Sequence, residues 1–102
     1  MRVEYKLEVS QVDTPRFAVE ALEGMGKLFS LATLVLNVLE TKESVEIVFH
    51  GMSQDDPQRR IASFKAIVAS CSGAPGVDYT DGPLATVPGS SSAFQWLRVS
   101  LS

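Results

Sequence analysis

Side chains that could carry out acid–base or nucleophilic chemistry are scarce in this sequence. Its 102 residues include one histidine, His50, and one cysteine, Cys71. An imidazole titrates near neutral pH and can act as a general base, and Tyr79 could offer a second proton-transfer group. We take His50 and Tyr79 as weak candidates for catalysis. No serine has a recognisable nucleophile elbow around it, so an enzyme is the less favoured interpretation.

Metal and thiol chemistry have equally little support. With one histidine and one cysteine, a zinc site would need an unusual set of carboxylates. Asp55 and Asp56 precede a predicted helix, where capping and favourable charge at the N-terminus explain them. Cys71 falls on the apolar stripe of that helix, as a small buried hydrophobic residue would. We expect neither a metal ion nor another cofactor.

The composition indicates a small globular domain and argues against nucleic acid or anionic lipid as its partner. A hydrophobic fraction of 45% and a charged fraction of 21% are ordinary globular values, and 102 residues fit a single α+β domain spanning residues 1–102. The net charge of −3 gives no broad basic field for nucleic acid or anionic lipid. The longest nearly apolar run, residues 28–39, is too short to cross a membrane. Without a secretory leader pattern, we expect a cytoplasmic location.

The elements that must position these side chains can be predicted from periodicity. Residues 2–9 alternate strictly between apolar and charged, which is typical of a strand with one buried face. The sequence Asp13-Thr14-Pro15 is a helix start, and apolar residues at helical spacing extend from it to Phe29. We therefore predict a first helix over residues 15–29.

The stretch from residue 31 to 52 has two interpretations. Continuing the helix would turn Leu31, Leu34 and Val38 toward its charged side, so we favour a strand over residues 33–39. A polar connection at residues 41–44 would then join it to a second strand at residues 45–50, as a β-hairpin. A single long helix that runs on through Leu39 is the alternative.

The second half of the chain is easier to interpret. Residues 57–71 carry an apolar stripe and open with Pro57, which predicts a second helix. Residues 72–92 are rich in Gly, Pro and Ser and predict a long loop, with a short extra strand at 77–79 or 84–87. Residues 94–101 form the last strand. Its register is ambiguous because Phe94 and Trp96 compete with the inward set Leu97, Val99 and Leu101 for the core.

The resulting order is strand, helix, strand, strand, helix, strand. This βαββαβ order predicts a ferredoxin-like split βαβ fold: a four-stranded antiparallel sheet with two helices on one face. The same order occurs in an RNA-binding module, which needs stacking aromatic residues on its central strands and basic residues nearby. The predicted strands lack this combination, so we do not expect nucleic acid as a partner. Many unrelated proteins share this arrangement, so it assigns no function.

The uncovered side of the sheet is then the surface of interest. We expect its interface residues to be Val35, Leu39, Val48, Phe94, Trp96 and Arg98. These residues favour a non-enzymatic protein-interaction module, with a second copy of the chain as the expected partner in a homodimer. The alternative is a dimeric α/β-barrel type of protein, in which two copies enclose a small-molecule cavity and His50 acts as acid or base.

Overall fold

The computed structural model describes residues 14–71 and 76–101. The predicted strand at residues 2–9 lies outside them. The described elements are β1 (Arg16–Val19), α2 (Met25–Val38), β2 (Ser44–Gly51), α3 (Asp56–Ser70), β3 (Val77–Asp81), β4 (Ala85–Thr86) and β5 (Ala93–Leu101). The predicted α+β class is confirmed.

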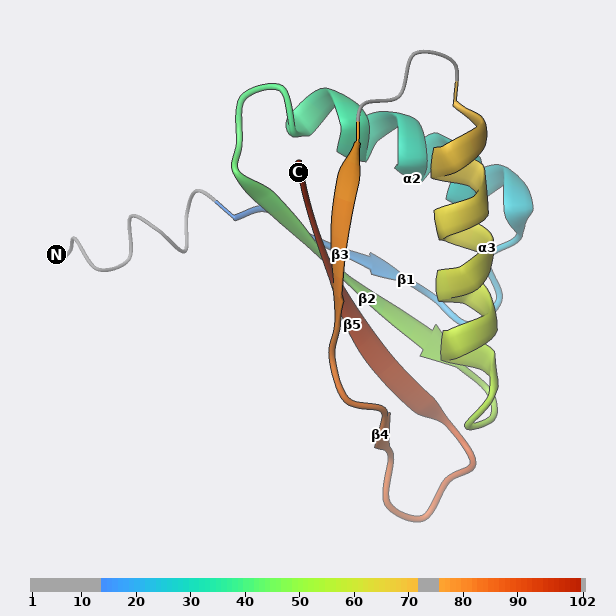
Figure 1. The fold of residues 1–102 in the computed structure, drawn as a ribbon. Coiled ribbons are helices and arrows are strands. Elements are labelled where there is room, and N and C mark those ends of the chain that lie inside the picture. The colour runs from blue at the N-terminus through green and yellow to red at the C-terminus, as the bar shows by residue number, and fades with distance from the viewer. Residues whose placement is uncertain (1–13, 72–75, 102) are drawn as a thin grey trace, which may run out of the picture.

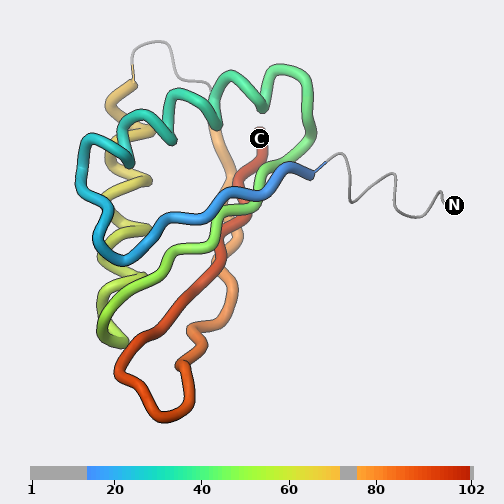
Figure 2. The backbone as a smooth tube through the Cα atoms, turned by 180° about the vertical axis from the view of Figure 1, so that it is seen from behind, coloured from blue at the N-terminus to red at the C-terminus, as the bar shows by residue number. Residues whose placement is uncertain are grey.

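The strands form one mixed sheet in the order β1-β2-β5-β3, and β4 pairs with the N-terminal end of β5. Strands β1 and β2 run parallel and are joined through α2, whereas β5 runs antiparallel to both of its main neighbours. Helices α2 and α3 lie on the same side of this sheet, as the two opposite views show (Figures 1 and 2). The other side of the sheet faces away from both helices.

The first half of the chain differs from the sequence-based prediction. Residues 16–19 form a strand beside β2 and not the start of a helix, which begins at Met25 after Gly24 in an extended conformation. Residues 33–38 continue that helix, so the predicted hairpin of residues 33–39 with 45–50 is wrong. The sheet contains a parallel pair, and the ferredoxin-like order with four antiparallel strands is therefore not confirmed.

The physical reason is the position of the buried stripe on α2. The prediction set the apolar face of the helix from residues 15–29, and the first of these belong to β1. Counted from Leu28, buried residues recur at three- and four-residue spacing along the whole helix and its C-cap: Leu28, Leu31, Ala32, Val35 and Leu39. Burial of this stripe outweighs the weak preference of β-branched residues for strands.

The second helix and the two long strands agree with the prediction. Phe64 on α3 is fully buried and packs edge-to-face on Phe49 of β2, with ring centroids 5.7 Å apart. On β5, Leu97 and Val99 face the core, whereas Phe94 and Trp96 alternate with them toward the other side. The ambiguous register is thereby resolved. Leu101, predicted inward, is 43% exposed because it lies at the strand end.

The predicted loop at residues 72–92 contains two strands. Strand β3 covers the suggested site at residues 77–79, and β4 falls within 84–87. Both pair with β5, β4 across the short connection at residues 87–92 and β3 from further back in the chain. Gly and Pro are abundant here because the chain makes tight connections between these strands, one of which places Gly89 at a positive φ of 76°.

Candidate functional site: the open sheet face

The side of the sheet opposite α2 and α3 is called the open sheet face. Its residues come from the alternate positions of each strand and lie in rows in cross-strand register. Three of these rows matter for the site, and a fourth holds Ser44, Ser100 and Asp78. The charged row holds Arg16, Glu46 and Arg98; the tryptophan row holds Ala18, Val48, Trp96 and Gly82; the phenylalanine row holds His50, Phe94 and Ala85.

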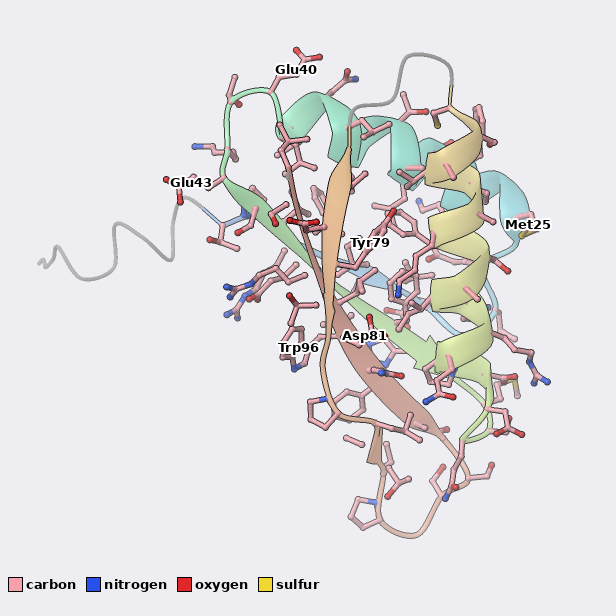
Figure 3. The ribbon with its side chains drawn as sticks, in the orientation of Figure 1. Met25, Glu40, Glu43, Tyr79, Asp81 and Trp96 are labelled. Atoms are coloured by element: carbon pink, nitrogen blue, oxygen red, sulfur yellow. The ribbon has the colours of Figure 1, made fainter. Side chains whose placement is uncertain are left out.

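Trp96 is held in place by a glycine on the neighbouring strand. The Gly82 N–H donates to the Trp96 carbonyl oxygen at 2.9 Å. A Cβ at position 82 would lie 2.2 Å from Cε2 of the Trp96 ring, so only glycine leaves room for the indole there. The indole therefore lies across the end of β3 on the open sheet face, as the side-chain view shows (Figure 3).

The phenylalanine row continues this apolar surface. The rings of His50 and Phe94 are 5.9 Å apart and tilted by 38°. Phe94 is 37% exposed, and Ala85 of β4 is its register partner on the other side. A half-buried Trp96, an exposed Phe94 and a half-buried Val48 thus form one continuous apolar area on β2 and β5.

The charged row is a three-member ion network. Nη2 of Arg98 lies 2.6 Å from Oε2 of Glu46, and Nε of Arg16 lies 2.9 Å from Oε1 of the same carboxylate. The hydrogen bond from Arg98 is the main cause that lowers the pKa of Glu46, with the Arg16 charge adding to it and partial burial opposing it. Glu46 is 16% exposed, whereas the two arginines are 50% and 73% exposed. Both arginines therefore retain water-facing donors.

His50 and Tyr79, the weak catalytic candidates, are not brought together. His50 lies on the open sheet face, whereas Tyr79 packs against the core on the helix-covered side. Lys65 of α3 lies over the Tyr79 ring, 5.0 Å from its centroid, and also pairs with Asp81 at 3.2 Å. Burial raises the pKa of Tyr79. The two proton-transfer groups of one chain therefore face opposite sides of the sheet.

Four other expectations can be compared with the structure. Val35 and Leu39 are buried in the core, so their predicted place on the open sheet face is wrong. Cys71 is half-buried against the core, and its Sγ donates to the Ile67 carbonyl oxygen at 3.3 Å. Among residues 14–71 and 76–101, no three acidic, histidine or cysteine side chains gather as metal ligands would. No helix within these ranges has the length and apolar character needed to span a bilayer.

Three residues of the site had no functional assignment in the sequence. Gly82 looks like an ordinary turn glycine within Asp-Gly-Pro, and Arg16 looks like part of a helix. Glu46 is one charged residue of an alternating strand, and nothing in the sequence pairs it with Arg16 and Arg98. Those contacts depend on the pairing of strands 30 and 52 residues apart, for which local patterns give no signal.

No protein-family model and no curated protein matches the sequence.

Proposed function

We propose that this chain is a non-enzymatic protein-interaction module that binds a second copy of itself through the open sheet face. The observation that carries the proposal is the apolar area of Trp96, Phe94 and Val48, on the side of the sheet that faces away from both helices. Tryptophan and phenylalanine supply large contact areas at low entropic cost, and they are typical anchors of protein interfaces.

The contacts within this surface support the same function. Gly82 fixes the indole of Trp96, and two ion pairs fix the long side chains around Glu46. Side chains that are already ordered lose little conformational entropy on binding, so more of the contact energy remains as affinity. An interface that is formed before its partner arrives is typical of protein-binding surfaces that change little on association.

The enzyme alternative has less support. A cavity between two copies would have to combine His50 with a second proton-transfer group. Tyr79 is that group in the sequence-based hypothesis, and it packs under α3 on the other side of the sheet. The ring that contacts His50 belongs to Phe94, which neither donates nor accepts a proton.

Light scattering coupled to size-exclusion chromatography tests the proposal. We expect a dimer for the wild type at micromolar concentrations and a folded monomer for Trp96→Glu, because a buried carboxylate at the centre of the interface would lack a partner. Phe29→Glu is the matched control. Phe29 is an aromatic residue on α2 that is 57% exposed, on the other side of the molecule.

Two results would contradict the proposal. A wild type that stays monomeric at high micromolar concentration would exclude self-association as the function. Dissociation by Phe29→Glu but not by Trp96→Glu would move the interface to α2, where Met25 and Leu34 are exposed together with Phe29.

A further inference from the structure

The charges of the open sheet face alternate in sign from strand to strand. Arg16 on β1, Glu46 on β2 and Arg98 on β5 share one row, and Asp78 lies on the same side of β3, two residues from the register partner of Arg98. The β3 position of the charged row is Thr80, whereas Asp78 lies one row away, opposite Ser100. Within the charged row the signs are therefore plus, minus and plus, and exchanging the neighbouring strands β2 and β5 sets Glu46 against Arg98, its electrostatic complement.

We infer that two copies pack face to face about a twofold axis that runs parallel to the strands, between β2 and β5. The inference rests on the proposed function and specifies its partner geometry. Rotation about this axis exchanges β2 with β5 and keeps every row at its level along the strands. Glu46 then lies opposite Arg98 of the second copy, and each copy contributes one such contact.

The same rotation makes the apolar rows match. Val48 comes to lie opposite Trp96 of the second copy, and His50 opposite Phe94 of the second copy, because both are register pairs within one chain. Face-to-face sheets lie about 10 Å apart, a distance that facing glutamate and arginine side chains span together. Aligned sheets rotate by about 30° relative to each other, which displaces residues near the axis least, and β2 and β5 flank the axis.

The other twofold axis in the interface plane, perpendicular to the strands, gives a poorer match. Centred on the tryptophan row, it sets each strand against its own copy in the reverse direction. Arg98 would then lie opposite Phe94 of the second copy, and Glu46 opposite His50 of the second copy. Arg98 and Glu46 would then lose each other as facing partners, so the charge complementarity of this pair favours the axis parallel to the strands.

Two charge reversals on separate chains test this geometry. Alone, Glu46→Arg and Arg98→Glu each place like charges in both contacts of a homodimer, and we expect the dimer Kd to rise by about tenfold or more. In an equimolar mixture, the first variant offers two arginines and the second two glutamates in the facing positions. We expect heterodimers in the mixture, with a Kd close to that of the wild type.

A matched control uses an ion pair from the helix-covered side. Lys65 and Asp81 lie 3.2 Å apart there. Lys65→Glu and Asp81→Lys should leave dimerisation unchanged and show no preference for heterodimers. Native mass spectrometry of the mixtures counts each species, and circular dichroism checks that every variant is folded.

The salt dependence of the wild-type dimer supplies a measurement that needs no variant. Two facing Glu–Arg contacts predict that the Kd rises as NaCl increases from about 0.05 to 0.5 M, because salt screens exposed charges. A Kd that stays constant or falls contradicts the inferred axis. A mixture of Glu46→Arg and Arg98→Glu that stays monomeric also contradicts the axis. If Trp96→Glu nevertheless abolishes the dimer, the open sheet face is the interface but the two copies pack with another geometry. A monomeric wild type would instead reject the proposed function itself.

Discussion

The two sides of strand β5 hold their side chains by different means. On the helix-covered side, Leu97 and Val99 are completely buried among residues of β2 and the helices. On the open sheet face, Trp96 and Arg98 stay in contact with water and are held by single contacts to Gly82 and Glu46. Burial of apolar area explains the first side. On the second side, one glycine and one carboxylate contact two side chains that remain partly exposed to water.

This contrast is consistent with the interface that we propose for the open sheet face. Exposed ion pairs contribute little to folding, typically less than about 1 kcal/mol each. A fixed arrangement of aromatic and charged groups is nevertheless what an interface requires. Substitutions on the helix-covered side should therefore affect stability, and those on the open sheet face should affect association more than stability.

The largest effect is expected in the core. Phe64 is fully buried and contacts the Phe49 ring, so Phe64→Ala should lower the free energy of unfolding by about 3 to 5 kcal/mol. Urea titration followed by circular dichroism measures this change. Arg59→Ala on the exposed side of the same helix is the control and should be nearly silent. Equal effects at both positions would mean that α3 turns a different face to the sheet.

A smaller effect on folding, together with a clear effect on association, is expected at Gly82. Gly82→Ala places a methyl group against the indole and forces Trp96 to move, which overpacking data put at about 1 to 3 kcal/mol. Because Trp96 is the proposed anchor, the dimer should also weaken. Gly24→Ala is a matched control, since a Cβ there meets no atom within 4 Å. An unchanged Trp96 emission spectrum in Gly82→Ala would refute the contact.

The smallest effect is expected from the charged row. The folded-state pKa of Glu46 lies below its ordinary value, so its ion pairs stabilise the fold above that value and are lost as pH falls through the lowered pKa. Thermal unfolding measured between pH 7 and pH 3 should therefore show a steeper acid decline in the wild type than in Glu46→Gln. Parallel curves would show that Arg16 and Arg98 do not stabilise the carboxylate in solution.

The two strands that build the site were predictable, and the helix before them was not. On β2, accessible and buried positions alternate throughout, and the alternation continues along most of β5. A period of two therefore assigns the side chains to the two sides once the register is fixed, although Gln95 faces inward while Phe94 and Trp96 lie on the open sheet face. Helix α2 is apolar around most of its circumference, with Lys27 as its single charged residue. A helix without a polar side does not show from its sequence which side is buried, so the prediction assigned the wrong residues to the buried side.

The contacts within the site required the fold itself. Gly82 reaches Trp96 only because β3 pairs with β5, and Arg16 reaches Glu46 only because residues 16–19 pair in parallel with β2. The parallel pairing of β1 with β2 requires a crossover connection through α2. The prediction assigned residues 16–19 to a helix, so it contained neither β1 nor this crossover. Sequence alternation could place Trp96 on a face, but it could not show what holds the ring there.

The central claim is that Trp96 lies in the contact between two copies, and its fluorescence tests this most directly. Trp96 is the single tryptophan of the chain, so its emission reports on one position. We expect a shift to longer wavelength on dilution from high micromolar to nanomolar concentration, with the same midpoint as the halving of mass, because the indole becomes exposed to water when copies separate. A concentration-independent spectrum, with or without a change in mass, would contradict the account.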